Sequence, residues 1–163
     1  MQSLPDPGFA GDTGQADPVV REALAAYSRD RVDAPVLAAL CRSRLLVPVV
    51  TLATQLGQPE SGLAHEKRAD VAAVLMQRAD GRKALLAFTS LTTLQAWDAK
   101  ARPVPVSTVD AARSAEQAGA SAVIVDAAGP VRFAIQTPAL QRLAAGQRLA
   151  ETSGGYFWLA TAR

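Results

Sequence analysis

The chain has 163 residues, 49% of them hydrophobic and 20% charged, which is enough apolar material for one folded domain and excludes an intrinsically disordered chain. The formal net charge of only +2, with the arginines scattered, argues against nucleic-acid binding, because phosphate binding requires clustered Lys and Arg side chains. Cys41 is the single cysteine, which excludes an intramolecular disulfide and a thiolate metal cluster.

Residues 1–16 are rich in Pro, Gly and Asp and contain no basic residue, so we expect a flexible acidic arm. This segment also lacks the basic and apolar regions of a signal peptide. The longest apolar stretch, residues 45–56, is interrupted by Pro48 and is too short to span a membrane. These features predict a cytoplasmic protein with no membrane association.

Two short helices are expected after the arm. Asp17 is a good N-cap with Pro18 at the first helical position, and a second helix begins near Asp33 with Pro35 in its first turn. Because only one turn separates them, the two helices are predicted to form a helical hairpin. The β-branched segment that follows predicts a buried strand, in which Pro48 must occupy a position that needs no ladder donor.

The middle of the chain alternates strands and helices. Residues 69–90 predict two strands joined by a tight turn at residues 79–81, and Ser90 or Thr92 caps a short helix that ends near Trp97. Residues 101–106 are extended because of their two prolines. Ser107 then caps a helix that ends at Gly119.

The last part of the chain predicts a hairpin around residues 128–130 and a helix over residues 137–146. Residues 147–163 form an aromatic tail, which either packs as an edge strand or remains loose. Gly154-Gly155 lacks the Lys-Ser/Thr pair of a phosphate-binding loop, and we interpret it as flexible. The overall order of elements predicts an α+β domain over residues 17–146: one mixed β-sheet covered by helices and preceded by the helical hairpin.

Four stretches together resemble the SseB N-terminal-domain family: EKRADVA, GRKALLAFTSLTTLQAW, ARPVPV and AVIVDAAGP, within residues 42–146. Two positions depart from the pattern: Val71 stands where relatives are expected to carry methionine, and Leu86 stands where they often carry proline. The resemblance implies a bacterial, cytoplasmic protein. The namesake of the family is linked to enhanced serine sensitivity, and the family brings no catalytic mechanism that could be transferred.

Catalytic residues are not evident. His65 is the only histidine and lies in a polar loop, where we interpret it as a solvated side chain. No spacing of His, Cys, Asp and Glu predicts a metal site, and no cofactor is expected. Lys67 and Asp70 belong to a mixed charge cluster, which is either an ordinary solvated loop or the polar rim of a binding surface.

A candidate binding surface runs from Thr89 to Val106. The Thr89 and Ser90 hydroxyls stand at a helix start, where they either cap the helix or help to bind an anion. Trp97 and Arg102 suit recognition of a peptide or ligand, although Trp97 could instead fill core volume.

We therefore expect a non-catalytic, cytoplasmic protein-interaction domain that binds a protein partner through this surface and through the aromatic tail. The alternative is a small-molecule or anion sensor that binds at the helix N-terminus after Phe88. The sequence leaves open whether the protein forms a homo-oligomer.

Overall fold

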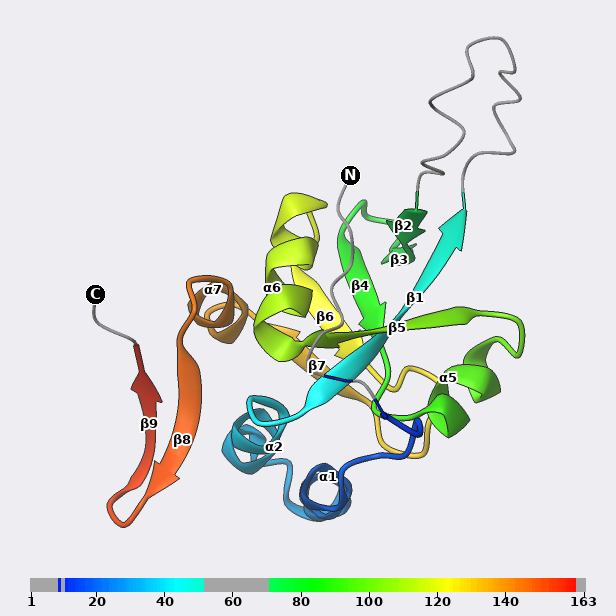
Figure 1. Cartoon of the computed structure of the whole chain (residues 1–163). Coiled ribbons are helices and arrows are strands. Elements are labelled where there is room, and N and C mark those ends of the chain that lie inside the picture. Colours follow the sequence, from blue (N-terminus) through cyan, green and yellow to red (C-terminus); the bar gives the residue numbers. More distant parts are fainter. Residues whose placement is uncertain (1–8, 10, 52–70, 161–163) are drawn as a thin grey trace, which may run out of the picture.

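A computed structural model describes residues 9, 11–51 and 71–160 of the chain (Figure 1). The helices are α1 (Pro18–Asp30), α2 (Asp33–Leu40), α5 (Leu91–Trp97), α6 (Thr108–Gln117) and α7 (Ala139–Ala144). The strands are β1 (Arg44–Thr51), β2 (Val71–Ala73), β3 (Leu75–Gln77), β4 (Lys83–Ala87), β5 (Arg102–Ser107), β6 (Ala122–Val125), β7 (Phe133–Gln136), β8 (Arg148–Thr152) and β9 (Gly155–Leu159). None of the helices in these ranges combines the length and the apolar character needed to cross a membrane.

The N-terminal helices begin where local signals place them. The Asp17 carboxylate accepts a hydrogen bond of 2.8 Å from the backbone N–H of Val19, and Pro18 occupies the first position of α1. Helix α1 ends at Arg31, whose φ of 57° is left-handed, and α2 follows at once from Asp33. The predicted N-terminal helical pair is therefore confirmed.

The strands are divided among three sheets. A sheet of order β2-β1-β5 is antiparallel, a mixed sheet of order β3-β4-β6-β7 contains the parallel pair β4·β6, and β8-β9 is a separate hairpin. The α+β class and a mixed sheet are confirmed. The expectation of a single sheet needs correction, because the strands form three sheets, of which only β3-β4-β6-β7 is mixed.

Two backbone connections join the first two sheets. Leu46 of β1 and Phe88, just after β4, exchange N–H···O bonds of 2.7 and 2.8 Å. Val74 stands between β2 and β3, and its N–H donates to Pro48 while its carbonyl accepts from Leu86. The chain thus passes from β2 in one sheet through Val74 to β3 in the other, and the hydrogen bonds of Val74 link the two sheets.

Prolines in β1 and β5 face each other. Pro48 pairs with Pro103, and Leu46 pairs with Pro105. Because the N–H of Leu46 is directed toward Phe88, these positions form the pairs that exchange no hydrogen bonds between β1 and β5. Pro48 therefore occupies a position that needs no ladder donor, as the sequence predicted.

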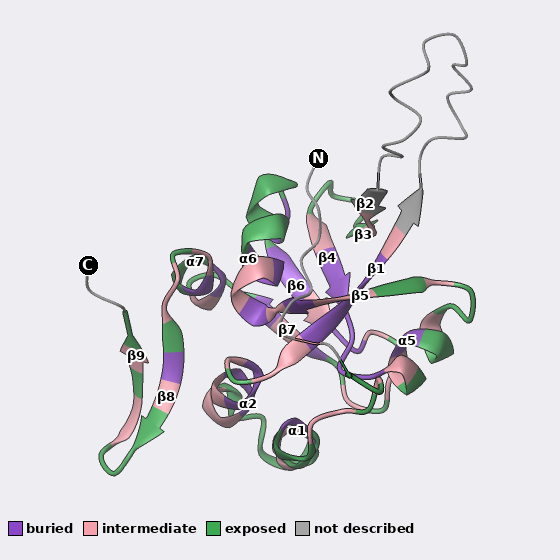
Figure 2. Cartoon of the chain, in the orientation of Figure 1, coloured by how far each residue is buried: buried purple, intermediate pink, exposed green. Residues whose placement is uncertain are grey.

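From Leu85 onward, strand β4 is buried on both faces, which explains its continuous apolar sequence (Figure 2). Leu85 and Ala87 belong to the main core with α1, α2, α6 and α7. Leu86 and Phe88 belong to a second, smaller core that α5 covers through Leu94. The junction from β4 to α5 is consequently held from both sides.

The C-terminal residues form a hairpin, which the sequence did not predict. Gly155, with φ of 123°, lies at the turn where β8 and β9 join, so Gly154-Gly155 is part of a turn and not of a flexible tail. Figure 1 shows this hairpin outside the two larger sheets, beyond α2 and α7. Leu149, 6% exposed, packs in the main core and fixes the hairpin to the domain.

Candidate functional site

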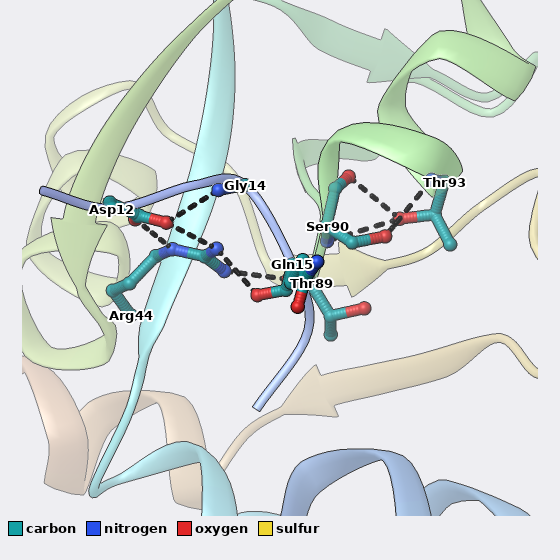
Figure 3. Close-up of polar contacts among 7 residues, drawn as sticks. All are labelled: Asp12, Gly14, Gln15, Arg44, Thr89, Ser90 and Thr93. Atoms are coloured by element: carbon teal, nitrogen blue, oxygen red, sulfur yellow. Dashed lines mark hydrogen bonds and ion pairs between the residues drawn. The ribbon is translucent and has the colours of Figure 1, made fainter. Parts of the chain in front are cut away.

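The candidate site begins with the cap of helix α5. The Ser90 hydroxyl accepts a hydrogen bond of 3.1 Å from the N–H of Thr93, and the Thr93 hydroxyl accepts one of 3.3 Å from the N–H of Ser90 (Figure 3). Ser90 is therefore the N-cap of a reciprocal capping box. The sequence predicted Ser90 or Thr92 as the cap, and the structure shows that it is Ser90.

A buried carboxylate, Asp126, joins this cap to the neighbouring strand. It lies just after β6, which runs parallel beside β4, and it is 3% exposed. The backbone N–H and the hydroxyl of Thr89 each donate to it at 2.8 Å, and the Thr93 hydroxyl lies 2.8 Å away. Sequence reasoning missed Asp126, although a single Asp directly after the apolar strand AVIV could have identified it.

The N-terminal segment occupies the other side of the junction. Arg44 donates to the Thr89 carbonyl at 2.6 Å and to the Gln15 carbonyl at 2.9 Å, and it pairs with the Asp12 carboxylate (Figure 3). The Arg44 hydrogen bond, aided by the Gly14 N–H and by the arginine charge, lowers the pKa of Asp12, although partial burial opposes this shift. The Gly14 carbonyl accepts from the N–H of Leu91 at 2.8 Å.

These contacts correct part of the expected flexible arm. Residues 1–8 and 10 lie outside the described residues, but Asp12, Gly14 and Gln15 are bonded to the domain. Gly14 has φ of 85°, and a side chain there would meet Leu91 at 2.5 Å, so only glycine fits without displacement. The arm prediction fails for these residues because their partners are distant in sequence.

The backbone donors at the start of α5 are largely occupied by the chain itself. The N–H of Thr89 donates to Asp126, that of Leu91 to Gly14, and that of Thr93 to Ser90. Among the described residues, no buried side-chain nitrogen or oxygen lacks a hydrogen-bond partner. These hydrogen bonds connect the strands, the helix and the N-terminal segment, and they leave few backbone N–H groups at the start of α5 for the predicted anion site.

The remaining predicted site residues are not brought together around this junction. Trp97 is half-buried against Phe88, with ring centroids 5.7 Å apart, and it belongs to the smaller core. Arg102 is exposed at the start of β5. Lys67 and Asp70, like His65, lie outside the described residues. Within the described ranges, no group of three or more His, Cys, Asp and Glu side chains could hold a metal ion.

An apolar surface is found instead on the hairpin β8–β9. The pairs Ala150–Phe157 and Arg148–Leu159 alternate with Leu149–Trp158 along the ladder, so they lie on the opposite face. Leu149 faces the core, whereas Phe157 and Leu159 are 50% and 41% exposed. We call this face, formed by Arg148, Ala150, Phe157 and Leu159, the outer face of the hairpin.

Comparison with protein families gives one match. The family model described as the SseB protein N-terminal domain matches residues 20–142, which include the junction around Asp126 but end before the hairpin β8–β9. Searches of the curated proteins and of the solved structures found no significant match.

Proposed function

The chain belongs to the SseB N-terminal-domain family, and we propose that it is a non-catalytic protein-interaction domain that uses the outer face of β8–β9 to bind a partner protein. The observation that carries this proposal is the exposure of Phe157 and Leu159 side by side on one strand. Aromatic and aliphatic side chains that share one exposed face are typical of protein interfaces.

The geometry of the hairpin supports this role. Its inner face is anchored by Leu149, so the outer face is presented on a fixed scaffold. The ladder has only two strands, and β8 lies against α2, where the Leu149 N–H donates to the Cys41 sulfur. Strand β9 has one edge that pairs with no other strand within the described residues and could accept a strand of a partner. A partner that covers the outer face would remove Phe157 and Leu159 from water.

The alternative, a sensor of a small molecule or anion at the start of α5, receives less support. The N–H groups of Thr89, Leu91 and Thr93 are bonded within the chain, as described above. Arg102, which is exposed, stays a predicted partner contact on a second surface. We propose that the protein acts in the cytoplasm of a bacterium, because a reducing compartment keeps a single free cysteine in its thiol form.

The test uses the purified full chain as bait in a bacterial lysate. A partner should be captured by the wild type and lost by the double variant Phe157→Ser with Leu159→Ser, while it is retained by Val32→Ser. Val32 serves as the control because its apolar side chain is 49% exposed and it belongs to the turn between α1 and α2, not to β8–β9. Arg102→Ala, run in parallel, tests the surface predicted from the sequence.

The captured protein should then bind the purified chain in a stoichiometric complex. Equal capture by the wild type and by the double variant, at equal melting temperatures, would refute the role of the outer face. A metabolite that is retained in native mass spectrometry, with no protein captured, would instead favour the sensor.

A further inference from the structure

The mixed sheet has one face that is only partly covered. Leu85, Val123 and Ile135 point into the main core and are at most 1% exposed. Their neighbours along the strands point to the opposite face, which α5 covers only near Leu86. The rest of that face forms a groove with a volume of about 650 Å³, within the range of about 300–1,000 Å³ that is usual for ligand sites. We call it the basic groove.

The floor of the basic groove is made of small side chains in register. Ala84 of β4 pairs with Ala122 of β6, and Ile124 of β6 pairs with Ala134 of β7. Met76 lies beside Ala84 at the edge strand β3. Such a floor lets the main chain or a modest apolar side chain of a ligand approach the sheet closely.

The rim of the groove is cationic. Arg78, Arg82 and Arg132 line it, and none of the described residues that line it is acidic. Asp80 pairs with Arg78 and Arg82 at 3.9 and 3.3 Å, so a net positive charge remains. The whole chain carries a formal charge of only +2, so this is a local excess of positive charge.

These cations lie at two separated places. Arg78 and Arg82 belong to the connection between β3 and β4, at the end of the sheet where β4 and β6 begin. Arg132 immediately precedes β7, which is antiparallel to β6, so it stands at the opposite end and near the opposite edge. A compact anion could not contact both groups, whereas an extended ligand that crosses the floor could.

We propose that the basic groove binds an extended, acidic peptide segment of a partner protein, with its carboxylates at both ends and its apolar middle on the alanine floor. Charge complementarity identifies the occupant as acidic, and the separation of the cations identifies it as extended. This surface shares no residue with the outer face of β8–β9, so it stands or falls separately from the function proposed above.

The test uses a fluorescent peptide of about seven residues, which spans roughly 20 Å when extended. It carries two Glu at each end and Leu-Ala-Leu in the middle, and its binding is followed by fluorescence anisotropy. Arg82→Glu and Arg132→Glu should each weaken its binding about tenfold or more. Arg21→Glu is the matched control, because it removes the same charge at an exposed position of α1 and should change binding little.

A shortened peptide without one Glu pair distinguishes an extended site from a compact one. Its binding should remain sensitive to one of the two arginine substitutions and become insensitive to the other. The proposal is overturned if the full peptide does not bind, if Arg21→Glu weakens it as much as Arg132→Glu, or if both arginines matter equally for the shortened peptide. Displacement of the peptide by inorganic tripolyphosphate at matched charge would also overturn it, by assigning the groove to a small anion.

Discussion

Asp12 and Arg44 form an ion pair across 32 residues of sequence, and their side chains are 20% and 10% exposed, although Asp12 as a whole is an exposed residue. Through it, a segment that composition alone assigns to a flexible arm is attached to the first residue of β1. The same arginine holds the carbonyl of Thr89, so the ion pair also supports the start of α5.

Removing the Asp12 carboxylate should therefore destabilise the whole domain. We expect Asp12→Ala to lower the free energy of unfolding by about 1–2 kcal/mol at neutral pH, because Arg44 loses a charged acceptor. Glu22→Ala, which removes an exposed carboxylate from α1, should change it by less than about 0.5 kcal/mol. Denaturant unfolding measures both, and equal stabilities for the wild type and Asp12→Ala would show that the segment is not held.

The contribution of Asp12 should depend on pH in a defined direction. Its pKa is lowered in the folded protein, so folding favours the charged carboxylate. The stabilisation is present above the ordinary Asp pKa of about 3.9 and is lost as the pH falls through the lowered folded value. The difference in unfolding free energy between the wild type and Asp12→Ala should shrink accordingly in acid, and a difference that grew there would contradict the assignment.

Asp126 should be among the most sensitive polar positions in the domain. Asp126→Ala removes the acceptor for Thr89 and Thr93 and places alanine at φ of 55°, so we expect a loss of about 3 kcal/mol. Asp126→Asn keeps an acceptor oxygen and tolerates this conformation, so it should lose about half as much. Equal losses in the two variants, measured by denaturant unfolding, would show that the carboxylate oxygens do not hold the junction.

Local signals explain what the sequence predicted. The caps Asp17, Ser90 and Ser107 each act on a backbone N–H within three residues, so a short window contains all the information. The continuous apolar character of β4 likewise follows from its own burial on two faces. For these reasons the order of helices and strands, up to α7, could be derived from the residues alone.

The predictions that failed depend on distant partners. Thr89 donates to Asp126 across 37 residues of sequence, and the Gly14 carbonyl accepts from the N–H of Leu91. Neither hydrogen bond produces a periodic pattern in the sequence from which it could be predicted. The hairpin β8–β9 is different, since Gly154-Gly155 between two apolar stretches is itself a turn signal. The prediction that Gly154-Gly155 is flexible is wrong, because a pair of glycines that binds no phosphate can still form a tight turn.

Trp97 and Arg102 both belong to the binding surface predicted from the sequence, but their substitution should affect the stability of the domain differently. Trp97→Ala should lower the free energy of unfolding by about 2–3 kcal/mol, because it removes the ring that packs on Phe88. Arg102→Ala should change it by less than about 0.5 kcal/mol, because the side chain is exposed. Thermal and denaturant unfolding of the two variants test this. If Trp97→Ala were as stable as the wild type, the Trp97 ring would not contribute to the core and could instead be a surface contact.

Cys41 should react slowly with alkylating reagents. Burial raises the pKa of its thiol, against a smaller opposing effect of the Leu149 N–H, which lies 3.4 Å from the sulfur. Because the thiolate is the reactive form, alkylation by iodoacetamide near pH 8 should be about tenfold slower in the folded protein than in guanidinium. Equal rates in the two conditions would mean that the thiol is accessible and ordinary.

Leu149 should control how firmly the hairpin β8–β9 is held. Leu149→Ala removes a side chain that is 6% exposed in the core, so we expect a loss of about 2–3 kcal/mol and faster hydrogen exchange across residues 148–159. Phe157→Ala is the control on the opposite face of the same hairpin, where half-exposure predicts a loss below about 1 kcal/mol and little change in exchange. Exchange measured by mass spectrometry on both variants separates the two faces. If Phe157→Ala accelerated exchange as much as Leu149→Ala, the outer face would be packed against the domain, and it could not serve as the partner surface proposed here.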